Sequence, residues 1–201
     1  MTARDLATAM ERVQSVLTRR PETGLHDDAP AAVRWCGDTR MVARHPGGLQ
    51  FETDMPTELG GTGDRVTPGW MMRAGLAACT ATVVAMKAAA RGIPLTTLEV
   101  DVGSRSDARG LLGMTDDDGT PVDAGSRDVT MHVRLCAPGV PAERLRALVD
   151  ESCRCSPILR VLSDGADVAL RVDVAESGQS AANRPAGLAA AGAASPAHEG
   201  P

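Results

Sequence analysis

Five cysteines are the residues of this 201-residue chain that suggest chemistry: Cys36, Cys79, Cys136, Cys153 and Cys155. A disulfide scaffold is typical of small secreted domains with a higher density of cysteine, so the pattern does not favour one. Zinc is not favoured either, because one residue separates Cys153 from Cys155 and zinc knuckles have at least two. We expect no metal and no cofactor. The open alternatives are redox or nucleophilic chemistry at a free thiol, or plain burial.

Cys79 falls in the middle of a long segment that is expected to be helical. Thr67 is suited to cap the helix, and Pro68 fits the first helical position, where its missing N–H has no partner to lose. Gly92 is a natural stop for a helix that continues to Arg91. A helix of this length would carry Cys79 far from either end.

The helix is apolar almost all round, since only Arg73 and Lys87 are charged between Met71 and Ala90. Such a helix is expected in the centre of a fold, and a partner subunit is expected to cover part of it. A mid-helix thiol needs a nearby cation to become reactive, and Arg73 does not share a face with Cys79. From these residues alone, a small buried side chain is the simpler interpretation of Cys79.

The remaining pattern predicts an α+β fold. An amphipathic helix is expected over 1–22, the main domain over 31–175, and a disordered tail rich in Ala, Gly, Ser and Pro over 176–201. Within the main domain, alternation predicts strands at 32–36, 40–44, 49–53, 98–102, 129–135 and 168–174. Two shorter helices are expected to begin at Pro141 and at Ser156-Pro157.

The composition and charge of the chain argue against some classes of function. The chain has no tyrosine, and its net charge of −5 comes without a concentrated basic stripe. With only Trp35, Trp70 and Phe51 to stack on bases, nucleic-acid binding is not expected. We expect no apolar segment long enough to span a membrane and no signal peptide, and therefore a cytoplasmic protein.

Four motifs resemble the signature of the OsmC/Ohr family, the osmotically inducible and organic hydroperoxide resistance proteins. They are Pro56-Thr-Glu-Leu-Gly-Gly61, Thr67-Pro-Gly-Trp70, Ala74-Gly-Leu-Ala-Ala-Cys79-Thr80 and Ser156-Pro-Ile158. The resemblance covers about Val33 to Val174, and the segment from Asp107 to Gly113 is similar to a divergent branch. It implies an OsmC-like fold, with antiparallel sheets around the long helix in an intertwined homodimer.

The resemblance also implies an activity, a thiol-dependent peroxidase in oxidative stress defence. Cys79 matches the cysteine that attacks an organic hydroperoxide or hydrogen peroxide and becomes a sulfenic acid. A second cysteine then forms a disulfide, which a dithiol reductant reopens. Cys155, with Cys153 beyond it, is the nearest candidate for the second cysteine. Arg40 is the preferred candidate for the family's activating arginine.

The chain departs from the family's pattern at two positions. Gly69 stands where the family has a glutamate, and Glu58 is a candidate to replace that carboxylate. Ser156 stands where the family has its second cysteine. Arg44 is an alternative to Arg40 for the arginine.

These departures keep two other functions open. One is a dimeric binding protein that has kept the fold and lost the peroxidase partners of Cys79. The other is a cysteine-dependent enzyme that acts on another small electrophile. Cys36 and Cys136 are expected in the core or on a sheet face, and Asp107 and Arg109 are expected to form a turn rather than line the pocket of the active site.

Overall fold

A computed structural model describes residues 3–174. Residues up to Ala166 belong to one compact unit, and those that follow belong to a second. Residues 167–174 contain no helix or strand, so the strand predicted at 168–174 is wrong for the single chain. An alternating segment becomes a strand only when a neighbouring strand satisfies its N–H and C=O groups. The disordered tail predicted for 176–201 lies outside the described residues.

The long helix α2 spans Pro68–Ala90 and confirms the predicted boundaries. The hydroxyl of Thr67 accepts a hydrogen bond from the backbone N–H of Trp70, at 3.2 Å, and so caps the helix. Arg91 is the C-cap, and the chain turns at Gly92, whose φ of +63° favours glycine. Local sequence alone therefore determines where this helix begins and ends.

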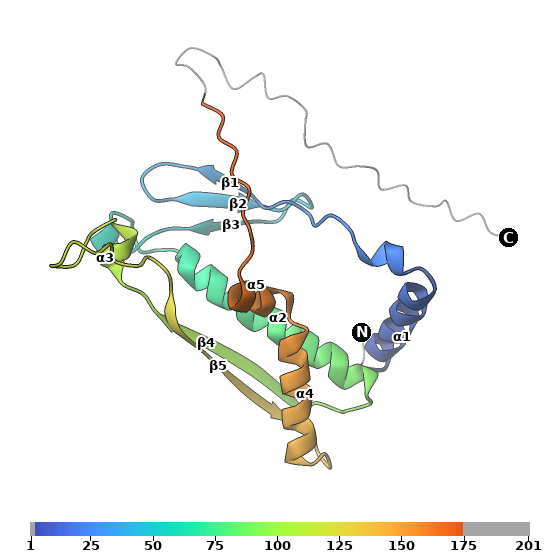
Figure 1. The fold of residues 1–201 in the computed structure, drawn as a ribbon. Coiled ribbons are helices and arrows are strands. Elements are labelled where there is room, and N and C mark those ends of the chain that lie inside the picture. The colour runs from blue at the N-terminus through green and yellow to red at the C-terminus, as the bar shows by residue number, and fades with distance from the viewer. Residues whose placement is uncertain (1–2, 175–201) are drawn as a thin grey trace. The chain divides into compact units, whose positions relative to one another are not determined.

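One stripe of α2 is buried, at residues four apart: Leu76, Thr80, Val84 and Ala88. Helix α4 (Ala142–Arg154), helix α5 (Pro157–Asp164) and strand β4 (Thr97–Arg105) pack on α2, as Figure 1 shows. Val84 and Ala88 join Ile93, Ala137 and Leu148 in the aliphatic core. Most other residues of α2 are half-buried or exposed, so a single chain covers only part of this helix.

Helix α2 is also long and apolar enough to cross a membrane. The expectation that no apolar segment reaches that length is therefore wrong. The same length and composition occur in the central helix of a soluble protein, and here α2 contributes to the core. Helix α2 is the single membrane-length helix in the part of the chain that the structure describes.

The strands form two antiparallel sheets. Strands β1 (Ala32–Trp35), β2 (Met41–Arg44) and β3 (Gln50–Thr53) lie in sequence order in one sheet, and β4 pairs with β5 (Arg127–Cys136) in the other. These five strands confirm the predicted ones. Antiparallel sheets with a central helix confirm the predicted α+β class.

The three-stranded sheet carries an apolar face. Its register places Val33, Ala43 and Phe51 in one row, and Trp35 lies two residues from Val33 on the same face. Val33, Trp35 and Phe51 are 61%, 65% and 49% exposed. Because β1, β2 and β3 make their main contacts with one another, this face is uncovered in the single chain.

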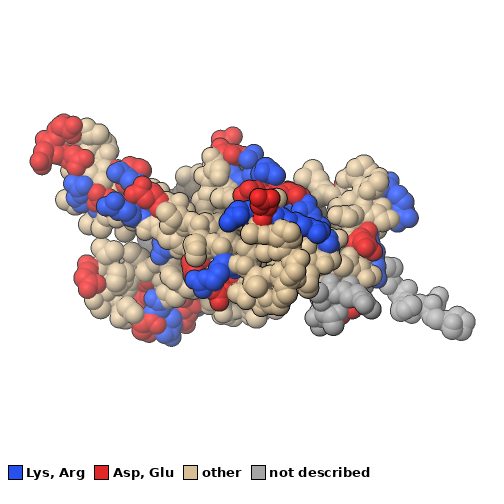
Figure 2. All heavy atoms as spheres, turned by 90° about the horizontal axis from the view of Figure 1, so that it is seen from below, with Lys and Arg blue, Asp and Glu red and all other residues tan. Residues whose placement is uncertain are grey.

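Helix α1 spans Ala3–Arg19 and packs on α2 (Figure 1). A short 3-10 helix over Pro21–Gly24 follows it, and another at Thr57–Leu59 precedes α2. A single helical turn, α3, spans Ala108–Leu111 after β4. On the face drawn in Figure 2, acidic and basic side chains lie next to one another, and neither sign forms a broad patch.

Candidate active site

Cys79 lies in α2 and faces the start of α5. The hydroxyl of Ser156 donates a hydrogen bond to the Sγ of Cys79 at 3.3 Å, and it also lies 3.3 Å from the Oγ1 of Thr80. Ser156 and Thr80 are fully buried, whereas Cys79 is partly exposed. Ser156 is the N-cap residue of α5, yet its side chain makes no capping hydrogen bond. The hydroxyl instead holds the sulfur in place.

A cavity of about 560 Å³ opens beside Cys79. One face of α2 forms its long wall, because Cys79, Val83, Met86 and Ala90 follow one another at helical spacing. The volume falls within the range of roughly 300–1,000 Å³ that is usual for small-molecule pockets. A largely aliphatic wall beside a sulfur nucleophile suits a substrate with an organic group.

Two further segments complete the cavity. Met10 and Gln14 of α1 line it, and so do Cys155 and Pro157 from the junction between α4 and α5. The cavity therefore joins two thiols from segments more than 70 residues apart in the chain. Of the cysteines predicted to act in the site, Cys155 is brought together with Cys79.

Lys87 lines the same cavity. Its Nζ donates to Oε1 of Glu151 at 2.7 Å, and Arg91 contacts the other carboxylate oxygen. The pKa of Lys87 is raised, mainly by the Glu151 carboxylate and further by the side chain of Cys155. The two cations in turn lower the pKa of Glu151 to about 2. A fixed ammonium group therefore lies beside the thiol of Cys155.

Cys153 has a different environment. It is half-buried in α4 and does not line the cavity. Burial raises the pKa of its thiol, and the charge of Asp150 raises it further. These surroundings favour the protonated thiol, so a role as the second cysteine stays a prediction with less support for Cys153 than for Cys155.

Arg40 lies in a carboxylate cluster instead of at the cavity. Its guanidinium contacts Glu52 at 3.1 Å and Asp54 at 3.0 Å, and it also pairs with Asp64. These contacts raise the pKa of Arg40, with the hydrogen bond to Asp64 as the largest cause. Within one chain Arg40 organises the loop that leads to α2. Contact with Cys79 stays a prediction for both Arg40 and the exposed Arg44.

Glu58, the candidate for the family's carboxylate, also lies outside the cavity of the two cysteines within one chain. Glu58 is exposed in the 3-10 helix over Thr57–Leu59 and does not line the cavity. At Gly69 a side chain would find ordinary contacts, with Arg73 Nη1 3.7 Å from the position of an added Cβ. Arg73 itself contacts the hydroxyl of Ser104 at 3.3 Å. Its guanidinium is therefore directed to β4 rather than to Cys79.

Cys36 and Cys136 are exposed, so of the two predicted places, the core and a sheet face, the core is excluded for both. Cys36 follows the last residue of β1, and Cys136 is the last residue of β5. A thiol at a strand end lies beyond the packed centre of its sheet.

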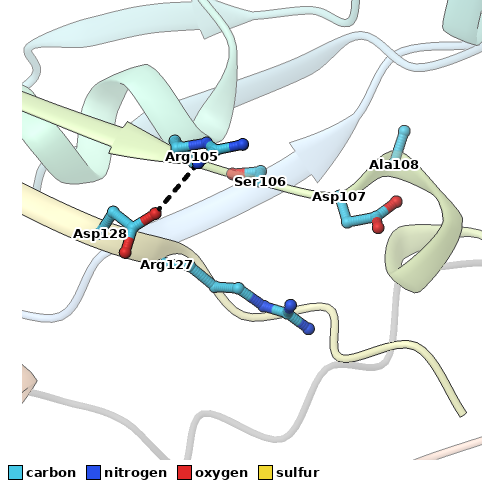
Figure 3. Close-up of a pocket in the computed structure, with 6 residues that line it drawn as sticks. All are labelled: Arg105, Ser106, Asp107, Ala108, Arg127 and Asp128. Carbon is cyan, nitrogen blue, oxygen red and sulfur yellow. Dashed lines mark ion pairs between the residues drawn. The ribbon is translucent and has the colours of Figure 1, made fainter.

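A second cavity, of about 310 Å³, lies where β4 ends and β5 begins, and it is drawn in Figure 3. Arg105 pairs with Asp128 across it, at 3.5 Å. Asp107 lines this cavity and caps α3 by accepting from the backbone N–H of Arg109. Arg109 pairs with Asp107 and Asp116, which confirms a turn built by these residues. The cysteines of the first cavity do not line this one.

Sequence reasoning missed the part that Lys87, Thr80 and α1 play in the site. Lys87 was visible as one of two charges in an apolar helix, and its spacing of eight from Cys79 places both on one face. No signal of this kind marks Met10 or Gln14. In the residues 3–174 that the structure describes, no group of three metal-ligating side chains is close enough to hold a metal ion.

Comparison with known proteins identifies the fold. A model of the OsmC-like protein family matches residues 61–171, more than half of the chain. The crystal structure of an OsmC-like protein from Mycoplasma pneumoniae is 19% identical, with a TM-score of 0.58 over 70% of this chain and 91% of that one. No curated protein sequence matches the chain.

Two further structures are similar. One is an organic hydroperoxide resistance protein OsmC from Legionella pneumophila, 19% identical, with a TM-score of 0.50 over 69% of this chain and 90% of that one. The other is an OsmC-like protein of unknown function from Vibrio cholerae, 12% identical, with a TM-score of 0.52 over 67% and 93%. At such identities the likeness shows the fold.

Proposed function

This chain belongs to the OsmC-like protein family, and we propose that it is a thiol-dependent peroxidase in oxidative stress defence. Its substrates are organic hydroperoxides or hydrogen peroxide, and Cys79 is the attacking residue. The name of the similar Legionella pneumophila protein, organic hydroperoxide resistance protein, supports a peroxide-related role. The observation that carries the proposal is the single cavity lined by both Cys79 and Cys155.

The reaction has three steps. The thiolate of Cys79 attacks the terminal oxygen of the hydroperoxide, the O–O bond breaks, and the alcohol leaves after taking up a proton. Cys79 is then a sulfenic acid. Cys155 attacks the Cys79 sulfur, a disulfide forms, and water leaves. A dithiol reductant reopens the disulfide and returns both thiols.

The surroundings of Cys79 suit the first step. The hydroxyl of Ser156 donates a hydrogen bond to the sulfur and holds it beside the cavity. The aliphatic side chains of Val83 and Met86 and the ring of Pro157 line the adjoining cavity. They give the organic group of a hydroperoxide an apolar wall, which favours such a substrate over hydrogen peroxide.

The working form in this proposal is a homodimer. The apolar sheet face that contains Val33, Trp35 and Phe51 is uncovered in one chain, and so is part of α2. Exposed apolar faces of this kind mark protein interfaces. A second copy would cover both, and its strands would offer a partner for the alternating segment 168–174. We also propose a reducing, cytoplasmic location, where the five free cysteines would stay reduced.

The second candidate function is a binding module without catalysis. It is favoured by the neutral neighbours of Cys79, the hydroxyls of Ser156 and Thr80, and by the engagement of Arg40 with carboxylates. In such a protein the cavity would hold an apolar ligand, and Cys79 would be an ordinary thiol.

Peroxide consumption separates the two functions. The reduced full chain is mixed with cumene hydroperoxide and dithiothreitol, and peroxide loss is followed by stopped flow. We expect turnover that Cys79→Ser abolishes and that Cys36→Ser, a matched change of an exposed thiol, leaves unchanged. Equal peroxide loss in Cys79→Ser and the unaltered chain would overturn the peroxidase proposal.

A further inference from the structure

Lys87 is the charged residue of α2 that enters the cavity of the two cysteines. The exposed fraction of its side chain is 24%. The ammonium group is held by Glu151 of α4 at 2.7 Å. The position of this cation is therefore set by contact with a second helix rather than by solvent.

The geometry of α4 brings the same cation to a thiol. Glu151 and Cys155 are four residues apart, so they lie on one side of this helix. Lys87 pairs with Glu151 and lines the same cavity as Cys155, and both side chains raise the pKa of Lys87. Arg91 contacts the other oxygen of Glu151 and does not line the cavity. The Glu151 carboxylate thus holds two cations, and Lys87 is the one beside the thiol.

The place of Cys155 in the helix makes a cation important. Cys155 is the C-cap residue of α4, so it lies at the helix end that carries partial negative charge and attracts a cation. The other ionisable groups that face this position are Lys87 of α2, Glu151 of α4 and Cys79 of α2, while α1 contributes the neutral Met10 and Gln14. Lys87 is the cation among these groups, and it lines the same cavity as Cys155.

We propose that Lys87 is a positioning residue that holds the side chain of Cys155 at the cavity for its attack on oxidised Cys79. The proposal rests on the proposed peroxidase function and names the residue that makes its second step fast. The neighbouring Ser156 contacts Cys79 directly, and consecutive Cα atoms are about 3.8 Å apart, so Cys155 is one residue removed from that contact.

Cys155 gives its proton to solvent, and its sulfur attacks the sulfur of the Cys79 sulfenic acid. An S–S bond forms and the S–O bond breaks, so the Cys155 sulfur is oxidised and the Cys79 sulfur is reduced. The hydroxide that leaves takes up a proton and becomes water. Lys87 stays protonated throughout and is unchanged at the end.

Alkylation of the reduced full chain by iodoacetamide tests the cation without any peroxide. Trypsin cleaves after Arg154, so Cys153 and Cys155 fall on separate peptides for mass spectrometry, and Cys36 serves as an internal reference. In Lys87→Met we expect Cys155 to be alkylated about tenfold more slowly at pH 7. Lys87→Arg should restore the rate, because it restores the charge.

Arg91→Met is the matched control, because it removes the other cation on Glu151. We expect it to leave Cys155 alkylation unchanged, as Cys36 alkylation should be in every variant. Equal Cys155 rates in Lys87→Met and the unaltered chain, or an equal loss in Arg91→Met, would overturn the role of Lys87. Circular dichroism melting of each variant separates an effect on the thiol from unfolding.

A second measurement separates this inference from the proposed function. After one equivalent of cumene hydroperoxide, formation of the Cys79–Cys155 disulfide is timed by acid quench. We expect Lys87→Met to slow this step about tenfold, and the rate of Cys79 oxidation is measured separately in the same samples. Cys79 that stays unoxidised in the unaltered chain would overturn the peroxidase function. A slowed Cys155 alkylation in the same samples would still support the Lys87–Cys155 pair.

Discussion

The hydroxyl of Ser156 donates to the Sγ of Cys79, 3.3 Å away, although Ser156 occupies the N-cap position of α5. A serine at this position ordinarily accepts a hydrogen bond from the backbone of its own helix. Here it makes no such bond, and it contacts Thr80 as its second partner. Ser156 contacts Cys79, 77 residues away in sequence, in place of capping its own helix. This exchange points to a functional constraint on the serine.

Ser156→Cys, made in a Cys155→Ser background, tests whether this contact can carry a disulfide. The new thiol would stand where the hydroxyl now touches Cys79. We expect Cys155→Ser alone to stop at the Cys79 sulfenic acid after one equivalent of peroxide, and the double variant to form a disulfide. Peptide mass spectrometry distinguishes the two products. A double variant that accumulates sulfinic acid without a disulfide would show that position 156 cannot resolve Cys79.

Ser156→Ala is the matched loss of the hydroxyl. It leaves the buried Oγ1 of Thr80 without this partner, which we expect to lower the free energy of unfolding by about 1–2 kcal/mol. It also removes the donor to Cys79, so iodoacetamide should label that thiol more slowly. Unchanged stability and unchanged labelling would mean that the contact is incidental.

Gly69→Glu should stabilise the protein. An added side chain meets Arg73 Nη1 and Thr67 Oγ1 at ordinary contact distances of 3.7 and 4.0 Å from its Cβ, so it has room. Glycine is unfavourable in a helix, and a carboxylate in the first turn pairs with the helix dipole and with Arg73 four residues on. We expect the free energy of unfolding to rise by roughly 1 kcal/mol, or about 2–4 °C in melting temperature.

Gly69→Ala separates the backbone effect from the charge. Thermal melting at low and high salt should show a gain for both variants, with the additional gain of Gly69→Glu shrinking at high salt. The charged gain requires an ionised carboxylate, so it is present above about pH 5 and is lost as the pH falls through the acid range. A lower melting temperature for Gly69→Glu than for the unaltered chain would contradict the geometry at Gly69.

The elements were predictable because local rules determine them. Thr67 and Pro68 mark the start of α2 by capping and by a fixed φ, and the result needs no knowledge of the rest of the fold. Pairing of strands depends on partners, and this is why alternation alone predicted a strand at 168–174 that one chain does not form. The site was less predictable because it joins three segments distant in sequence.

Ser156 and Lys87 show most clearly which contacts could not be predicted from the sequence. Ser156 was correctly placed at a helix start, but its hydroxyl turns away to Cys79, and only the packing of α5 on α2 decides that. Lys87 carried a visible charge in an apolar helix, but its link to Cys155 runs through Glu151 on another helix. Contacts of this kind depend on tertiary structure, and the spacing of residues along the chain does not reveal them.

Phe51→Glu should break the proposed homodimer. Phe51 lies in the apolar row with Val33 and Ala43, and burying it against a second copy would contribute about 1.5–3 kcal/mol. A buried carboxylate in its place would also be unpaired. We expect the dissociation constant to rise at least about 100-fold, seen by light scattering as a shift from twice 20.8 kDa to 20.8 kDa.

Gln50→Glu is the matched control, because it adds the same charge to the same strand on the opposite face. It should leave the mass unchanged. A monomeric mass for the unaltered chain at all concentrations would overturn the homodimer, and a dimer that survives Phe51→Glu would place its interface elsewhere.

Asp54→Asn should destabilise the loop that leads to α2, with a marked pH dependence. Asp54 is 1% exposed, and its carboxylate accepts from the Thr39 hydroxyl at 2.5 Å, from Thr62, and from Arg40. The Thr39 hydrogen bond is the largest of the causes that hold the pKa of Asp54 well below its usual range. A lowered folded-state pKa contributes stability above the unfolded value of about 3.9, and this contribution is lost as the pH falls below it.

We therefore expect Asp54→Asn to lower the melting temperature at pH 7 and the difference from the unaltered chain to shrink between about pH 4 and pH 2. Asp117→Asn, the same change at an exposed turn, should show no such difference. Differential scanning calorimetry across this pH range measures the melting temperature of each variant. If the difference in melting temperature between Asp54→Asn and the unaltered chain stays constant down to the lowest pH, the charge of Asp54 does not stabilise the loop. The protonated carboxyl would then serve as well as the carboxylate.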